Sequence, residues 1–394
     1  MISQIHIKNF KSIVDLKLDL GRINLFIGEN GSGKSNILEA IGFLSSSSTN
    51  IYQSNSTLFG KGVRVPKPEL FTSAFTNETK DIEIDIIING TSISTRYKYL
   101  NGSENRWVES TAFEESHAFS KFLSRFEGYI SYDPFDFVPY FSADKIIISP
   151  NTPPDIERVI LFEAKSHENY DRYRHGNYIN GYMIYSPETS FLRKFEEEGQ
   201  VSPLGVHGEG LFSLLKSIAY ENGGLTQIKE CLELIDWYED LSIPTDLMSN
   251  EYKINITDKY LDPGLKYMDQ RSANEGFLFL LFYVVLFSSH QTPEFFAIDN
   301  IEASFNPKLI SRLVSLLSDL SKKNNKQVLM TTHNPSTLDG MDLNDPDNRL
   351  FVVRRNTDGH TIVSRIEHKP ILSTKMKLSE MWTKGFLGGL PENF

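Results

Sequence analysis

Apolar and polar residues alternate along two segments near the start of the chain, residues 2–9 and 13–20. A period of two places successive side chains on opposite faces, so both segments are predicted to be half-buried strands. The same alternation recurs at residues 81–88 and 92–100, on either side of an Asn-Gly-Thr turn. An Asn-Gly step between two strands is a strong hairpin signal. We therefore expect antiparallel strands in the first hundred residues.

The last third of the chain has a different pattern, in which helical and strand segments follow one another. The pattern predicts helices at 275–288 and 307–322 and strands at 294–299, 326–331 and 349–354. Strands that alternate with helices are typical of a parallel α/β sheet. The apolar run at 276–287 is about half as long as a membrane-spanning helix needs, so a buried helix and no membrane role are expected.

One motif in the first fifty residues carries recognisable chemistry. An apolar strand at 22–27 leads into GENGSGKS at 28–35, and helical spacing follows from Lys34 onward. This fits G-x-x-x-x-G-K-[ST], in which glycines let backbone N–H groups wrap a phosphate chain. Lys34 would supply charge to the terminal phosphates of ATP, and the Ser35 hydroxyl would hold Mg²⁺. The predicted nucleotide-binding residues are Asn30, Gly31, Ser32, Gly33, Lys34, Ser35 and Asn36.

Other candidate site residues lie in the last third. Asp299 ends an apolar strand and is expected to hold Mg²⁺ through water. His333 follows the next strand, where an imidazole could sense the terminal phosphate. Ser272, Asn274 and Gly276 lie at the start of the predicted buried helix. They could bind a phosphate offered by another subunit, or the polar residues could simply cap the helix.

Composition narrows the class of protein. A chain of 394 residues with 40% hydrophobic residues predicts a globular protein of one to three domains. The formal net charge of -11 argues against a protein that coats nucleic acid by bulk electrostatics, although a local basic groove stays open. The single cysteine, Cys231, builds neither a disulfide framework nor a zinc site. Together with an N-terminus that lacks an apolar signal core, this predicts a cytoplasmic protein.

The order of these motifs resembles the ABC-type ATPases of the SMC, RecF and OLD group, also called AAA15-type ATPases. The opening IHIKNFKSI is similar to that group's I-x-N-F-[KR]-S signature, and the phosphate loop follows. Further along, SANEG is similar to the signature loop, AIDNIE to the Walker B strand, ASFNP to the D-loop and TTHNP to the switch histidine. The resemblance covers about residues 1–45 and 270–355.

The resemblance implies an α/β fold, an ABC-type P-loop ATPase head with a mixed central sheet and an inserted, largely helical lobe. The head is expected in two parts, residues 1–114 and 271–394, with the lobe at 115–270. It also implies that two heads dimerise head to tail around ATP or form a higher oligomer. The phosphate loop of one head would face the 272–276 loop of the other, with Lys11 and Ser12 near the adenine side.

Asn300 departs from the group, which has a glutamate directly after the Walker B aspartate. An amide cannot accept a proton from the attacking water, so hydrolysis should be slow. Glu302 could substitute as the base, slow hydrolysis could make ATP a lock for a long-lived assembly, or the protein could be a nucleotide-sensing scaffold with negligible turnover. Slow turnover is the favoured interpretation, and the catalytic candidates are Glu302, Asn300 and His333.

The resemblance says less about the pathway. We expect the sensor or scaffold subunit of a bacterial antiphage system of the abortive-infection type, which controls a separately encoded effector. The alternative is a RecF-like or SMC-like ATPase that acts on DNA in repair or maintenance. Two segments each have two interpretations. His207 and Glu209 in GVHGEGLF favour a capped turn over a functional role, and the C-terminal segment from residue 378 either docks a partner or packs on its own head.

Overall fold

The structure is a computed structural model that describes most of the chain. The described residues are 1–47, 55–64, 70–73, 81–100, 106–114, 124–132, 146–150, 152–171, 177–195, 203–221, 223–244, 252–262, 264–368 and 376–390.

The chain divides into two compact units, each assembled from segments that are far apart in sequence. Unit 1 comprises residues 1–21, 32–182 and 354–363, and unit 2 comprises residues 22–31, 183–353 and 364–394. The chain passes from unit 2 to unit 1 inside the predicted phosphate loop, between Gly31 and Ser32. The domain division expected from the sequence, with boundaries near residues 115 and 270, stays a prediction.

Unit 1 is built on a five-stranded antiparallel sheet in the order β2-β1-β4-β5-β6. Its strands are β1 (Ile2–Phe10), β2 (Ile13–Asp19), β4 (Ile82–Ile88), β5 (Thr91–Leu100) and β6 (Arg106–Glu114). Alternate residues of β4 are buried, as a period of two requires. Asn89 and Gly90 join β4 to β5 with φ of 51° and 86°, the left-handed conformation of a type I′ turn. The predicted strands and hairpin are confirmed.

Helices and two short paired strands complete unit 1. They are α1 (Lys34–Ser47), α2 (Asn55–Gly60), α4 (Pro154–Asp171), α5 (Asn177–Asn180), β7 (Ile130–Tyr132) and β8 (Ile146–Ile148). The apolar face of α1 is buried, and its Phe43 ring packs against Phe10 of β1 at 5.7 Å between centroids. The Tyr182 hydroxyl donates a hydrogen bond to the Leu38 carbonyl oxygen at 3.1 Å. The helix that follows the phosphate loop is thereby anchored on the strands of its own unit.

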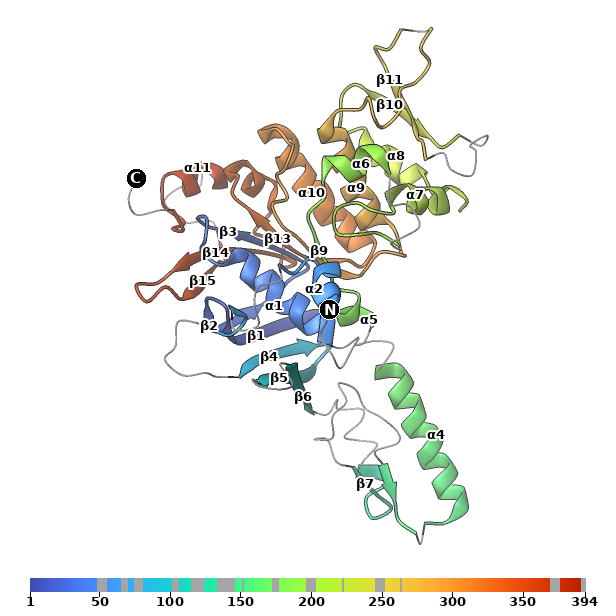
Figure 1. The fold of residues 1–394 in the computed structure, drawn as a ribbon, viewed down its shortest axis with the longest axis vertical. Coiled ribbons are helices and arrows are strands. Elements are labelled where there is room, and N and C mark those ends of the chain that lie inside the picture. The colour runs from blue at the N-terminus through green and yellow to red at the C-terminus, as the bar shows by residue number, and fades with distance from the viewer. Residues whose placement is uncertain are drawn as a thin grey trace. The chain divides into compact units, whose positions relative to one another are not determined.

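A six-stranded sheet in the order β15-β14-β3-β13-β12-β9 contains the parallel strands of the fold, most of which lie in unit 2 (Figure 1). Its strands are β3 (Ile23–Ile27), β9 (Ile184–Tyr185), β12 (Phe295–Ile298), β13 (Gln327–Thr332), β14 (Asn348–Arg355) and β15 (Thr361–Ile366). The five strands from β14 to β9 are parallel. Every residue of β3, β12 and β13 is buried, as in sheets covered on both faces. The predicted α/β class with parallel strands in its central sheet is confirmed.

Unit 2 also contains helices and one separate pair of antiparallel strands. They are α6 (Thr189–Lys194), α7 (Leu211–Ala219), α8 (Thr226–Leu232), β10 (Tyr238–Ser242), β11 (Asn255–Asp258), α9 (Glu275–Ser288), α10 (Pro307–Lys323), the 3-10 helix η4 (Pro335–Gly340) and α11 (Leu378–Thr383). The residues of α9 from Phe277 to Phe287 are each at most 3% exposed. A helix that is apolar all round must be buried all round, so α9 is a central helix of the core.

The sequence pattern extended one helix too far. Helical spacing of the sequence near 225–239 predicts one helix there, but α8 ends at Leu232 and β10 begins at Tyr238. The reason is long-range pairing, because Tyr238 lies opposite Asp258 of β11. Helical spacing reports only local preference, and strand pairing with a distant segment overrides it.

The C-terminal segment packs within unit 2 as far as it is described. Met381 and Trp382 of α11 are buried, and the Ser379 hydroxyl donates to Asp339 of η4 at 2.8 Å. Residues 391–394 lie outside the described residues. Among the helices that the structure describes, none combines the length and the apolar character needed to cross a membrane.

Candidate functional site

The phosphate loop occupies the stretch between β3 and α1. Its glycines take backbone conformations that other residues avoid, with φ of 77° at Gly31 and 106° at Gly33. Lys34 begins α1 and is only 5% exposed. The Ser32 hydroxyl is buried and has no hydrogen-bond partner among the described residues. A buried orphan hydroxyl in a loop of this shape fits a ligand with acceptor oxygens, such as a phosphate.

A buried chain of hydrogen bonds holds the second half of the loop. The Asn36 amide donates to the Ser12 hydroxyl at 2.7 Å, and Ser12 bonds to the Thr361 hydroxyl at 2.7 Å. Thr361 in turn donates to the Ser32 carbonyl oxygen at 2.9 Å. A Cβ atom on Gly33 would lie 2.0 Å from the Thr361 hydroxyl oxygen. Thr361 therefore packs directly on the loop, and only glycine fits beside it.

Removing the Thr361 hydroxyl should loosen the loop without changing its shape. We expect Thr361→Val to weaken ATP binding by about fivefold, because one buried hydrogen bond contributes about 1 kcal/mol. Isothermal titration with ATP and Mg²⁺ measures the effect. Thr361→Ser keeps the hydroxyl and should bind like the wild type. Equal ATP affinity in all three proteins would contradict a role for this contact.

Lys11 belongs to a buried ion pair. Its ammonium group bonds to Glu39 of α1, which is 2% exposed and also accepts from Arg64 Nε at 2.6 Å. Burial lowers the pKa of Lys11 below that of a free lysine, and the charge of Glu39 opposes this shift. Two residues of the β1–β2 turn thus contact α1, Lys11 through Glu39 and Ser12 through Asn36 of the first turn of the helix. Their predicted place near adenine stays a prediction.

Asp299 follows β12 at the carboxyl edge of the parallel sheet. The Thr331 hydroxyl donates to Asp299 Oδ1 and accepts from the Asn300 N–H at 2.9 Å. One hydroxyl of the neighbouring strand therefore sets the orientation of both residues. Asn300 itself has φ of 57°, a left-handed conformation that asparagine tolerates better than most residues. The β3 strand that enters the phosphate loop ends at this same edge, with Ile27 opposite Thr332.

Glu302 and His333 are joined at this edge. The carboxylate Oε1 of Glu302 accepts from the His333 backbone N–H at 2.7 Å. The other oxygen, Oε2, is buried and without a partner among the described residues. The structure thus brings together three of the predicted residues in unit 2, Asp299, Glu302 and His333, with Asn300 between the first two.

The signature-like loop lies at a separate place in unit 2, at the start of α9. The Asn274 side chain caps α9 by accepting from the Phe277 N–H at 2.8 Å, as the capping interpretation predicted. Ser272 lies outside this cap and bonds to Asp269. Gly276 lies against the Ser304 carbonyl oxygen, and the Ser304 hydroxyl donates to Glu275 at 3.3 Å. The loop therefore contacts the D-loop-like turn directly.

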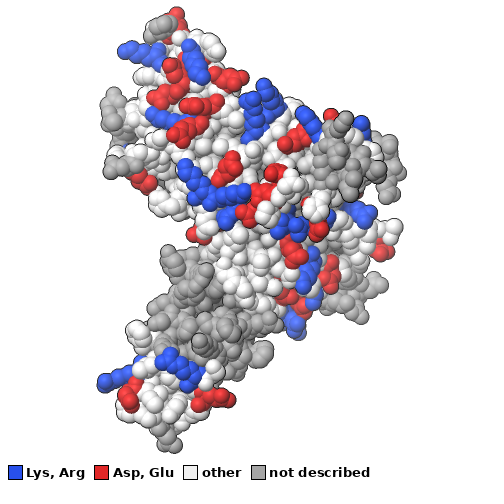
Figure 2. Space-filling view, turned by 180° about the vertical axis from the view of Figure 1, so that it is seen from behind, with Lys and Arg blue, Asp and Glu red and all other residues white. Residues whose placement is uncertain are grey.

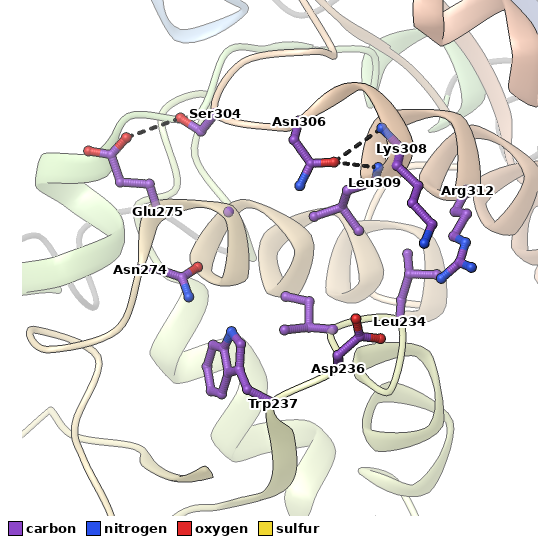
Figure 3. Close-up of a pocket in the computed structure, with 12 residues that line it drawn as sticks. Leu234, Asp236, Trp237, Asn274, Glu275, Ser304, Asn306, Lys308, Leu309 and Arg312 are labelled. Atoms are coloured by element: carbon purple, nitrogen blue, oxygen red, sulfur yellow. Dashed lines mark hydrogen bonds between the residues drawn. The ribbon is translucent and has the colours of Figure 1, made fainter. Parts of the chain in front are cut away.

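A pocket of about 560 Å³ opens beside this loop (Figure 3). Its walls are Asn274, Glu275 and Gly276 of the signature-like loop, Ser304 and Asn306, the turn before β10, and one face of α10. In Figure 3, Lys308 and Arg312 extend from α10 toward the turn that carries Asp236 and Trp237. The pocket combines the cations Lys308 and Arg312 and the N-terminus of α9 with the carboxylates Asp236 and Glu275, so its lining is of mixed charge.

Two family models match the chain. The model described as "AAA ATPase domain" matches residues 1–177, and the model described as "AAA domain, putative AbiEii toxin, Type IV TA system" matches residues 241–339. The fold is similar to the "SmcHead bound to the C-winged helix domain of ScpA", with a TM-score of 0.55 and 16% identity over 93% of this chain and 98% of that one. Both models describe AAA-type ATPase domains and the fold is that of an SMC head, which is consistent with a P-loop ATPase of the SMC/RecF/OLD type.

Two short sequence matches agree with this group. The chain is 54% identical over 44 residues to the "DNA replication and repair protein RecF" of Lactococcus lactis subsp. cremoris (strain MG1363), 11% of this chain and 12% of that protein. It is 57% identical over 42 residues to the uncharacterized protein MJECL10 of Methanocaldococcus jannaschii, 10% of this chain and 19% of that protein. The matched segments span less than a fifth of either relative.

Several residues that hold this ATPase-group site were missed by sequence reasoning. Thr331 and Thr361 are ordinary strand residues in the sequence, and Glu39 reads as a polar position on α1. Their partners lie far away along the chain, so no local signal marks them. The roles assigned to the individual site residues stay predictions.

Proposed function

We propose that this protein binds ATP in the phosphate loop, hydrolyses it slowly and assembles with a second copy around it. The observation that carries the proposal is the loop itself, which begins at the carboxyl edge of the parallel sheet and keeps a buried Ser32 hydroxyl that bonds to none of the described residues. Ligands of open α/β sheets bind outside the carboxyl ends of the strands. Asp299 directly follows β12 at the same edge.

The residues present fit a nucleotide with its magnesium ion. Lys34 is the proposed partner of the terminal phosphates, and the Ser35 hydroxyl and the Asp299 carboxylate are the proposed oxygen donors for Mg²⁺. Bound Mg²⁺ would neutralise charge on the phosphates. The Thr331 hydroxyl donates to Asp299 Oδ1 and so fixes the orientation of this carboxylate at the edge of the sheet.

Slow ATP hydrolysis is expected from the side chains of the residues that follow Asp299 in the chain. Asn300 carries an amide, which cannot take a proton from water. Glu302 is the next carboxylate along the chain. Its Oε1 atom accepts from the His333 N–H, and its Oε2 atom is buried. A general base must reach the attacking water, so neither residue supplies one in this conformation.

Assembly with a second copy is supported by the exposed signature-like loop. Ser272, Asn274 and Glu275 are exposed, and the pocket beside them offers Lys308 and Arg312. A helix N-terminus with nearby cations favours a phosphate group. We propose that this loop faces the ATP of the second copy, head to tail.

The proposed biological role is the sensor or scaffold subunit of a bacterial antiphage system that controls a separate effector. The match to a model described by a putative toxin of a type IV toxin–antitoxin system supports a defence setting. Slow hydrolysis suits a sensor, because a long-lived ATP-bound assembly can hold an effector until a trigger releases it. The cytoplasm is the proposed compartment.

A second candidate function is DNA repair or maintenance. The short, highly identical matches to RecF proteins favour it. Figure 2 shows Lys and Arg interspersed with Asp and Glu on one face, and the net charge is -11. Interspersed charges give weaker attraction to DNA than a continuous basic stripe, which makes this the second candidate. Stimulation of phosphate release by DNA, with a strong dependence on salt, would favour it over the first.

Lys34→Ala tests the proposed function directly. We expect about a hundredfold loss of ATP affinity, because a lost charged hydrogen bond costs up to about 3 kcal/mol, and loss of the ATP-dependent increase in mass. Titration calorimetry and mass photometry measure the two effects. Lys17→Ala, an exposed lysine of β2 in the same unit, is the control. An unchanged affinity in Lys34→Ala would refute the assignment of the phosphate loop.

A further inference from the structure

The sheet edge that carries Asp299 continues onto one more strand, β9. Residues Ala297 and Ile298 of β12 lie opposite Ile184 and Tyr185 of β9 in parallel register. The Asp299 N–H then donates to the Tyr185 carbonyl oxygen at 3.0 Å. Whatever follows Tyr185 in the chain is therefore the immediate neighbour of Asp299 at the carboxyl edge.

The segment after Tyr185 brings a histidine to this edge. The Ser186 N–H donates to the Val206 carbonyl oxygen at 2.8 Å. The Glu188 N–H donates to the His207 carbonyl oxygen at 2.9 Å. The GVHGEG sequence thus runs beside the end of β9. The His207 Nδ1 atom lies 3.1 Å from the Ser186 carbonyl oxygen and 3.4 Å from Glu188 Oε1.

The glycine-rich turn holds this imidazole in place. Glu209 Oε2 accepts from the His207 backbone N–H at 2.9 Å, and the Gly205 N–H donates to the Glu209 carbonyl oxygen at 2.7 Å. A Cβ atom at Gly205 would lie 2.3 Å from that carboxylate. The His207 ring also stacks on Phe191, with centroids 5.8 Å apart and planes at 20°. Glu209 therefore closes the turn, and the turn fixes the His207 ring.

These contacts leave one ring nitrogen available as a proton acceptor. A carbonyl oxygen only accepts, so Nδ1 must carry the proton that bonds to Ser186, and Nε2 of the neutral ring carries the lone pair. Nε2 has no hydrogen bond to any residue that the structure describes. The His207 side chain is 32% exposed, so water can reach it. An oriented imidazole with a carboxylate behind it is a typical base arrangement.

We propose that His207 is the general base for ATP hydrolysis, in place of the carboxylate that Asn300 lacks. This inference rests on the proposed ATPase function. The water oxygen forms a bond to the γ-phosphorus, and the bond from that phosphorus to the β–γ bridging oxygen breaks, with its electron pair staying on ADP. The water proton passes to Nε2 of His207. Glu188 stabilises the imidazolium that forms, and Ser186 keeps the ring oriented.

The test separates nucleotide binding from turnover. His207→Asn keeps a side-chain N–H for the Ser186 oxygen but has no basic nitrogen. We expect ATP affinity within about twofold of wild type and phosphate release slowed by at least about tenfold, since a general base contributes about a hundredfold or more. Single-turnover phosphate release and calorimetry measure the two quantities. His290→Asn is the matched control, because His290 also lies near a glutamate in unit 2 but follows the C-terminal end of α9, whereas the signature-like loop lies at the N-terminal end.

Two further variants keep the inference falsifiable if His207→Asn folds poorly. Imidazole in the buffer should restore turnover to His207→Ala and not to Lys34→Ala. Glu188→Gln should slow release by a few-fold, because it removes the charge behind the imidazole. Unchanged release in His207→Asn, or a loss of release that only follows a loss of ATP binding, overturns the base assignment. A wild type that binds ATP without releasing phosphate also overturns it, whereas a wild type that binds no ATP overturns the proposed function itself.

Discussion

Asn300→Glu is expected to raise the rate of ATP hydrolysis by about a hundredfold. The change puts a carboxylate directly after Asp299, where it can accept a proton from the attacking water, and such bases contribute about 10²–10⁴ in rate. The position is open to a new side chain, because Asn300 is exposed and its hydrogen bonds to described residues come from its backbone, the N–H to Thr331 and the carbonyl oxygen to the Ala303 N–H. The gain has a cost in stability of about 1 kcal/mol, since glutamate tolerates a φ of 57° less well than asparagine.

Phosphate release under single-turnover conditions measures this gain. Asn300→Gln is the matched control, because it makes the same backbone demand and carries an amide, so its rate should stay at the wild-type level. Asn300→Glu in a His207→Asn background should restore turnover, since it supplies a second base at the same edge. A rate that stays flat in Asn300→Glu would show that residue 300 does not face the attacking water.

Glu39→Gln is expected to destabilise the protein by about 3–5 kcal/mol. Glu39 is 2% exposed and neutralises both Lys11 and Arg64. Removing one member of a buried ion pair leaves the other charge buried without compensation, and this is the costly change. Because burial already lowers the pKa of Lys11, the lost carboxylate should lower that pKa further. Denaturant unfolding of the variant and the wild type measures the difference.

Glu83→Gln provides the matched control for Glu39. Glu83 of β4 also pairs with one lysine and one arginine, Lys8 at 3.2 Å and Arg96 at 2.8 Å. The Glu83 side chain is 26% exposed, so Glu83→Gln should lower the free energy of unfolding by less than about 1 kcal/mol. Similar losses for both variants would mean that burial of the Glu39 pair contributes little. A large loss at Glu39 alone would tie the stability of α1, and of the loop before it, to the Lys11 turn.

Slow chemistry and tight assembly are compatible in one protein. If His207 is a weaker or less well placed base than a glutamate at position 300, the ATP-bound state lasts longer before hydrolysis ends it. A long-lived ATP-bound assembly can then act as a lock that an outside event releases. The proposed sensor role needs this property.

The sequence by itself determined the local elements and the chemistry of the phosphate loop. Periodicity of two marked β1, β2, β4 and β5, and apolar runs marked α9 and the parallel strands, because the spacing of buried side chains is a local property. GENGSGKS identified a phosphate-binding loop because its glycines and lysine are contiguous. Asn300 stood out for the same reason, as the residue directly after Asp299.

Only the tertiary structure decided which distant residues meet. The order β3-β13-β12-β9 places the ends of four strands at one edge, and strand pairing between remote segments leaves no local signal. Thr331 reaches Asp299, Thr361 reaches the Ser32 carbonyl, and His207 reaches the end of β9, each across a long stretch of chain. The sequence could name GVHGEG as a turn, but the fold alone put its imidazole beside the Ser186 carbonyl oxygen, just after the end of β9. Side chains that act together here are brought together by backbone hydrogen bonds between strands, which depend on the whole sheet.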